Sequence, residues 1–98
     1  MKLIWSPLAV DRVRDIAEYI ALDKSSAAEK WVTDIFDSVG RLVEFPQSGR
    51  IVPEIKRSEI REISKGNYRI IYKVKTETIL ILTVKSYRQL LKPEEIQP

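Results

Sequence analysis

The chain has 98 residues, of which 44% are hydrophobic and 32% charged, and its formal net charge is +3. This length and balance predict one small globular domain, and no apolar run approaches the ~18 residues that a membrane-spanning helix needs. The absence of cysteine excludes disulfides and thiolate chemistry, and the N-terminus lacks a secretory signal, so we expect a cytoplasmic protein. Histidine is also absent, which removes the commonest general acid–base group and the commonest transition-metal ligand.

The first residues predict a short strand that leads into a helix. Residues 2–5 read Lys-Leu-Ile-Trp, and Ser6 followed by Pro7 is a typical helix start. The serine side chain can accept from free backbone N–H groups, and proline is tolerated at the first helical position. Apolar residues then recur at helical spacing, which predicts a helix with one buried stripe that ends near Leu22.

A second helix is expected from Ser26 to about Glu44. Ser26 and Glu29 have the spacing of a capping box, and apolar residues follow at helical intervals until Phe45-Pro46 ends the pattern. Because only residues 23–25 connect the two helices, they should form an antiparallel hairpin.

The second half of the chain predicts strands after a loop at residues 46–58. Gly66-Asn67 and residues 75–77 are plausible hairpin turns between apolar or alternating segments. The last segment is almost wholly apolar, as is typical of a central strand. The three expected strands are residues 60–64, 68–75 and 78–84.

These elements predict an α+β fold. We expect a two-helix hairpin packed on one face of a small, mainly antiparallel, twisted four-stranded sheet, with residues 2–5 as an edge strand. The tail, residues 89–98, either docks against the body or frays as chain ends often do.

The charge is unevenly distributed along the chain. Residues 56–98 contain ten Lys/Arg and five Asp/Glu, a net of +5, whereas residues 1–55 contain seven and nine, a net of −2. A basic sheet favours a polyanionic or acidic partner, because clustered charge attracts such a partner more strongly than scattered charge. The alternative is that these basic residues only solvate edge strands and turns.

No cofactor or metal motif is present. The three glycines are isolated and the acidic residues are dispersed, so we expect neither a cofactor nor a metal site. The residues that could perform chemistry instead lie in the loop and strands of the basic half. The candidate catalytic residues are Glu54, Arg61, Arg69 and Tyr87, and the candidate substrate-binding residues are Arg50, Lys56, Lys85 and Arg88.

Such a set suits metal-independent cleavage of RNA by its own 2′-hydroxyl. Glu54, unless it is an ordinary loop carboxylate, would be the base, and the two strand arginines would hold the phosphate with paired N–H groups. Tyr87 would protonate the departing 5′-oxygen. Because an unperturbed tyrosine titrates near pH ~10, it would need Lys85 or Arg88 to lower its pKa.

This hypothesis requires that Arg61, Arg69 and Arg88 converge in one anion-receptive pocket opposite the helices. In the alternative, these arginines have no shared role. Arg61 would pair with Glu59 or Glu62 at the surface, and Arg69 would be a solvated strand residue.

Several segments, in order along the chain, resemble the RelE/ParE superfamily of toxins from toxin–antitoxin operons. They are the opening IWSPLA, the YI and SSAAE of the helices, FPQSGRIVPE, IREI, NYRIIYKV and ILILTVKSYRQLL, which together cover nearly the whole chain. The resemblance implies a small twisted antiparallel sheet with two helices on one face, in agreement with the elements above. It also implies a cognate antitoxin, whose C-terminal segment wraps the toxin.

Members of this superfamily have two main activities. RelE-like toxins cleave mRNA in the ribosomal A site with basic residues, often a loop glutamate, and a tyrosine or histidine near the last strand. ParE-like toxins poison DNA gyrase by binding it. The residues that fall on the RelE-like pattern are Glu54, Arg61, Arg69, Lys85 and Tyr87.

The chain departs from the pattern after its last strand. Many relatives have a histidine there, in a Val-x-His-x-Arg-like motif, where this chain reads VKSYR at residues 84–88. RelE-like nucleases without that histidine do exist. The resemblance therefore leads us to expect a toxin that cleaves ribosome-bound mRNA, with inhibition of DNA gyrase as the alternative and a non-toxic antitoxin-binding relative as the third possibility.

Overall fold

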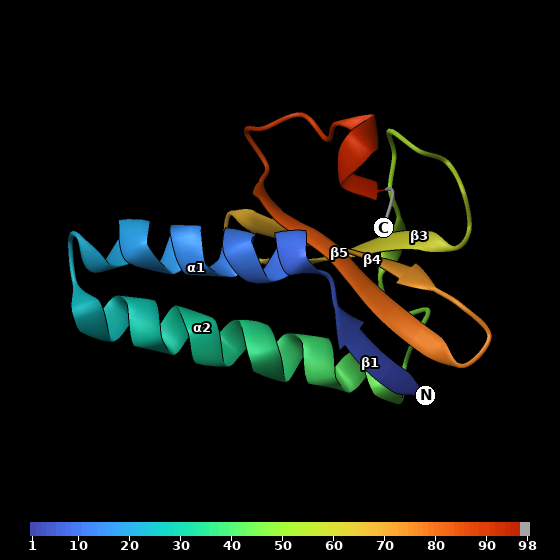
Figure 1. Ribbon diagram of the computed structural model, residues 1–98, viewed down its shortest axis with the longest axis horizontal. Helices are drawn as coiled ribbons and strands as arrows, with labels where there is room; N and C mark the ends of the chain where they lie inside the picture. The colour runs from blue at the N-terminus through green and yellow to red at the C-terminus, as the bar shows by residue number, and fades with distance from the viewer. Residues whose placement is uncertain (97–98) are drawn as a thin grey trace.

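In the computed structural model, which describes residues 1–96, two helices lie on one face of a five-stranded sheet (Figure 1). The helices are α1 (Pro7–Ala21) and α2 (Ser25–Gly40), and two 3₁₀ turns are η1 (Arg41–Val43) and η2 (Pro93–Ile96). The strands are β1 (Lys2–Trp5), β2 (Arg50–Ile51), β3 (Ile60–Lys65), β4 (Tyr68–Val74) and β5 (Thr78–Ser86). Neither helix combines the length and apolarity that would let it span a membrane.

The sheet has the order β1-β5-β4-β3-β2. The expected α+β class, the helical hairpin and the edge position of β1 are confirmed. The expectation of four strands is wrong, because β2 forms within the segment that we expected to be a loop. It pairs only Arg50 with Glu62 and Ile51 with Arg61, and a two-residue strand is too short to have a recognisable periodicity. β1 runs parallel to β5, whereas the other strand pairs are antiparallel.

The two expected helix starts differ in outcome. Ser6 caps α1 as predicted: its Oγ accepts from the Ala9 N–H at 3.0 Å and donates to the Leu82 carbonyl at 2.8 Å. The capping box at Ser26 is wrong, because α2 begins one residue earlier and its N-cap is Lys24, which makes no side-chain capping bond.

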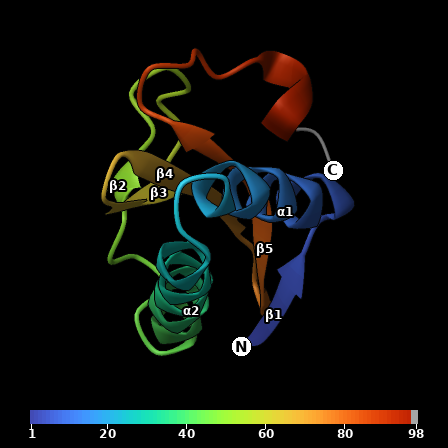
Figure 2. The same ribbon diagram turned by 90° about the vertical axis from the view of Figure 1, so that its left-hand side faces the viewer.

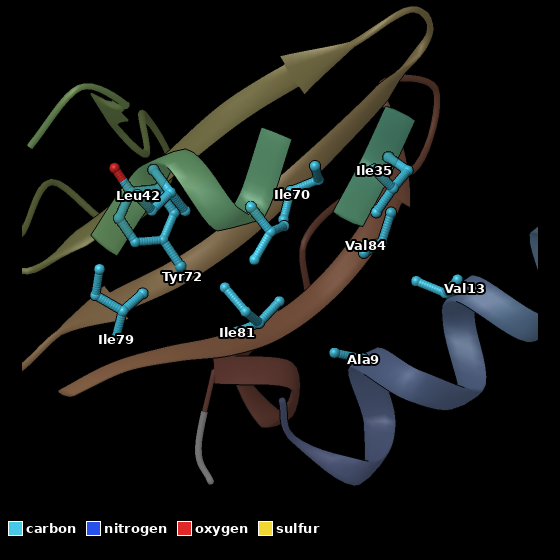
Figure 3. Packing of buried hydrophobic residues seen from close by; sticks show 10 residues of the cluster. Ala9, Val13, Ile35, Leu42, Ile70, Tyr72, Ile79, Ile81 and Val84 are labelled. Atoms are coloured by element: carbon cyan, nitrogen blue, oxygen red, sulfur yellow. The ribbon is translucent and has the colours of Figure 1, made fainter. Parts of the chain in front are cut away.

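The main core lies between the helices and the sheet (Figure 3). Ala9 and Val13 of α1 face the sheet, and the α2 residues Ile35 and Val39 fill the other half of this layer. The β4 and β5 residues that complete it are Ile70, Tyr72, Ile79, Ile81 and Val84. The stripe predicted from helical spacing therefore faces the sheet.

A second cluster lies on the opposite side of the sheet, which we call the open face because neither helix covers it. The loop before β3 and the tail after β5 cover this face instead, on the side of the molecule away from α2 (Figure 2). Docking of the tail is confirmed for the described residues, through Leu91 and Ile96. The cluster consists of Val52, Ile60, Ile71, Leu80, Leu82 and Leu91. β5 is thus buried on both sides, which explains its almost wholly apolar sequence.

A β-bulge between β4 and β5 determines which residues reach the open face. Ile71 pairs with Thr83 but Tyr72 pairs with Ile81, so Leu82 is an extra residue in β5. Beyond the bulge Arg69 pairs with Lys85, and both side chains lie on the open face.

Candidate functional site

Arg69 is the centre of a charged cluster on the open face. Its side chain is only 5% exposed, and its guanidinium donates to two carboxylates. Nη1 and Nη2 bind the two oxygens of Glu54 at 2.7 and 2.8 Å, and Nε binds Glu62 Oε1 at 2.7 Å. Glu54 comes from the loop before β3 and Glu62 from β3 itself, so Arg69 joins this loop to the centre of the sheet.

Glu62 belongs to the cluster, although from the sequence we expected it only as a possible surface partner of Arg61. It is 1% exposed and also accepts from Arg50 Nε at 2.7 Å. The four residues form a chain of alternating charge, Arg50–Glu62–Arg69–Glu54, with no net charge. The sequence contained a signal for this burial, because Glu62 is two residues after the apolar Ile60 and so lies on the same face of the strand. A carboxylate that is buried on that face requires a cationic partner.

Tyr87 covers the outer side of this cluster. Its ring lies 5.7 Å from Arg69 Cζ, a cation–π arrangement, and its hydroxyl hydrogen-bonds Ser64 Oγ. Tyr87 is 42% exposed, so the face of the ring away from Arg69 is open to solvent. Glu54, Arg69 and Tyr87 are therefore brought together as expected, with Arg50 beside them.

The pairing determines the protonation of Glu54. Hydrogen bonds from Arg69 lower the pKa of Glu54 to about 2, and the same bonds raise the pKa of Arg69. A carboxylate with so low a pKa is ionised at neutral pH but has little affinity for a proton, which makes it a weak general base. The guanidinium edges that would receive a phosphate are already bound to carboxylates.

Arg61 does not join the cluster. It pairs in register with Tyr72, whose ring lies in the core under the helices, so Arg61 extends from the sheet face opposite to Arg69. Its guanidinium donates to the backbone carbonyls of Gly49 at 2.9 Å and Ser58 at 3.0 Å. It thereby ties together two parts of the loop before β3. The expected convergence of Arg61 with Arg69 is wrong.

Lys85 lies on the open face but is not available to a substrate. It is 4% exposed and forms a buried ion pair with Glu95 of η2. We expected Lys85 to bind substrate, but the tail covers this residue. Arg88 and Lys56 are exposed, and within residues 1–96 neither takes part in an ion pair.

Comparison with known proteins agrees with this fold. Residues 3–91 match the family model described as the ParE toxin of the type II toxin–antitoxin system parDE. A solved structure of the chromosomal ParDE toxin–antitoxin system from P. aeruginosa is similar at 25% identity and a TM-score of 0.73, over 88% of this chain and 95% of that chain. No curated protein sequence gives a significant match. Because the family model covers most of the chain, the protein belongs to the ParE toxin family of type II toxin–antitoxin systems.

Proposed function

We propose that this protein is the toxin of a type II toxin–antitoxin module, that it arrests growth by binding DNA gyrase, and that a cognate antitoxin neutralises it. Two findings support a binding mechanism. The chain matches the ParE family, whose members are expected to act on gyrase, and its Arg69 is already neutralised by Glu54 and Glu62.

The main support for this proposal is that the charge of Arg69 is already neutralised. Cleavage of RNA by its 2′-hydroxyl needs a base, a free cationic group for the phosphate, and an acid for the leaving oxygen. To receive a phosphate, Arg69 would have to release a carboxylate. Breaking a buried pair typically costs about 3–5 kcal/mol, so phosphate binding here would have to displace an established partner.

Cleavage of ribosome-bound mRNA is the second candidate, and one arrangement favours it. The Tyr87 ring lies over the Arg69 guanidinium, and that guanidinium binds the Glu54 carboxylate, so the three groups could act on the same phosphate if Arg69 released Glu54. This hypothesis requires the phenolic proton of Tyr87.

Purified gyrase and a relaxed plasmid provide the test. The chain should prevent supercoiling and increase the amount of cleaved plasmid, and Tyr87→Phe should do so equally well, because the ring stays over Arg69 and only the hydroxyl is lost. The nuclease would be established instead if the chain left gyrase unaffected and cut mRNA on ribosomes, and if Tyr87→Phe failed to cut that mRNA. A chain that does neither, and causes no growth arrest, would be a non-toxic relative that binds only an antitoxin.

A further inference from the structure

A pocket of about 380 Å³, which we call the edge pocket, lies at the edge of the sheet beside the start of β2. Its walls come from the end of α2, from η1, from the residues that lead into β2, and from β3. It borders the charged cluster through Arg50 and Glu62, whereas Arg69 itself does not line it. The charged residues of the lining are Arg41, Arg50 and Glu62, so positive charge exceeds negative charge there.

The guanidinium of Arg50 is held in place but keeps donors for a ligand. Its Nε and Nη2 both lie 2.7 Å from Glu62 Oε2, while Glu62 Oε1 accepts from Arg69. One carboxylate is thus shared by two arginines and cannot neutralise both. The Arg50 side chain is 59% exposed, and its Nη1 has no hydrogen-bond partner among residues 1–96, so this nitrogen is available to a ligand.

Arg41 supplies a second cation from a different wall of the pocket. It is the first residue of η1 and is exposed, and it forms no ion pair within the described part of the chain. Its Nη2 donates to the buried hydroxyl of Ser38 at 3.4 Å, and Ser38 also lines the pocket. This bond ties the Arg41 guanidinium to the wall, and Nη1 and Nε remain for a ligand.

The edge of β3 adds a backbone donor. Lys65 and Tyr68 flank a two-residue turn and form a hydrogen-bonded pair, so the backbone groups of Ser64, one residue earlier, point away from β4. The bond from the Val52 N–H to the Ile60 carbonyl agrees with this alternation. Because β2 begins only at Arg50, opposite Glu62, no strand residue lies opposite Ser64. Its N–H is therefore free of a strand partner and borders the pocket.

These donors suit a phosphate group better than a carboxylate. They come from three elements, η1, β2 and β3, and so approach the pocket from different walls. A carboxylate presents its oxygens in one plane, whereas the oxygens of a phosphate point in several directions and carry more charge. Guanidinium groups bind phosphate oxygens with paired N–H donors, and such charge-assisted bonds are about twice as strong as neutral ones.

We propose that the edge pocket binds a phosphate group, which Arg41 and Arg50 hold between them and to which the Ser64 N–H donates. A free nucleotide and a nucleic-acid backbone both carry such a group. Unlike phosphate binding at Arg69, binding here breaks no buried ion pair, because Arg50 keeps its bonds to Glu62. The proposal does not depend on the proposed function.

A titration with inorganic phosphate, followed by the amide signal of Ser64 in ¹H–¹⁵N spectra of the full chain, tests this site. Ionic strength is kept constant with sodium chloride. Arg41→Gln removes one of the two cations, and Arg14→Gln is the matched control, because it makes the same charge change at an exposed position of α1 outside the pocket. The dispersion of the same spectra shows that each variant is folded.

The Ser64 signal of the wild type and of Arg14→Gln should shift and saturate at about millimolar phosphate. Arg41→Gln should bind about tenfold more weakly, as expected for the loss of one charge-assisted contact. Shifts that rise without saturation and equally in all three chains would show an adventitious ion only and would overturn the proposal. Equal saturation by acetate would also overturn it, since the pocket would then not distinguish phosphate from carboxylate.

Two further titrations distinguish the sources of the phosphate. If adenosine 5′-monophosphate saturates the Ser64 shift below the concentration that inorganic phosphate needs, and a DNA duplex leaves the signal unchanged, the ligand is a free phosphorylated molecule. If the duplex shifts the signal and Arg41→Gln weakens that effect, the pocket contacts a nucleic-acid backbone. Both results support the site. The gyrase assay is separate, so its failure would leave phosphate binding unaffected.

Discussion

The two faces of the sheet are both buried, but they are buried by different chemistry. The face under α1 and α2 is packed with aliphatic side chains and with the ring of Tyr72 from β4, and the apolar stripes of the two helices cover it. The open face is closed by irregular segments, the loop before β3 and the tail, and its buried charged residues are ion-paired. Those residues include Glu62, Arg69, Lys85 and Glu95.

The difference shows how a segment without regular structure can be held in one place. A helix brings a stripe of apolar side chains, whereas a loop of a few residues brings one or two. A carboxylate on such a loop finds directional partners on the sheet, so Glu54 and Glu95 each determine where their segment lies. We therefore expect the contribution of the open face to stability to depend on charge and pH. The contribution of the face under α1 and α2 should depend mainly on side-chain volume.

Arg69→Ala should have the largest effect. It leaves Glu62 buried without its strand partner and releases Glu54, and removal of one member of a buried pair typically costs about 3–5 kcal/mol. Urea unfolding at pH 7 measures the loss. The control is Arg88→Ala, an exposed arginine that should change stability by less than about 0.5 kcal/mol. A loss for Arg69→Ala as small as that of the control would show that the ion pairs do not hold the open face.

Ile35→Ala tests the helical face. Ile35 is fully buried between α2 and the sheet, and its truncation leaves a cavity that should cost about 2–5 kcal/mol. Because no charge is involved, the loss should be the same at pH 7 and at pH 4. A loss that depended strongly on pH would contradict the distinction between the two faces.

Two glycines provide a matched pair with opposite expected signs. A Cβ on Gly49 would lie 2.5 Å from the Glu62 carbonyl oxygen and 2.6 Å from the Tyr72 hydroxyl, so Gly49→Ala should destabilise by about 1–3 kcal/mol. A Cβ on Gly40 would meet nothing within 4 Å, so Gly40→Ala should stabilise α2 by up to about 1 kcal/mol. Thermal unfolding of both variants distinguishes them, and a stabilising Gly49→Ala would show that the loop before β3 is not held closely against the sheet.

The smallest effect should come from Glu54 and should depend on pH. The pKa of Glu54 is lower in the folded chain than in the unfolded chain. Its contribution to the free energy of unfolding is therefore present above about pH 4.5 and is lost as the pH falls towards about 2. About a third of its side chain is exposed, so solvent screening keeps the contribution near 1 kcal/mol or less. Glu54→Gln should therefore reduce the difference in urea midpoint between pH 7 and pH 3. An unchanged difference would mean that Glu54 is not paired in solution.

The local sequence was sufficient to predict most of the elements. Helical spacing, the Ser6-Pro7 start and the apolar alternation of the second half are properties of neighbouring residues, and they led to both helices and to β1, β3, β4 and β5. The opposite faces of Arg61 and Arg69 could also have been derived. The predicted two-residue turn Gly66-Asn67 pairs Arg61 with Tyr72 and Arg69 with Ser64, which places the two arginines on different faces.

Other features could be decided only by the tertiary structure. The two-residue strand β2, the bulge at Leu82 and the burial of Lys85 under Glu95 each depend on residues at least nine positions apart in the sequence. Periodicity reports which side of its own element a residue occupies, but not which segment will cover that side. The sequence by itself therefore determined most of the elements and the family. The folded chain decided which charges are paired, because an ion pair depends on distance in space and not on position along the chain.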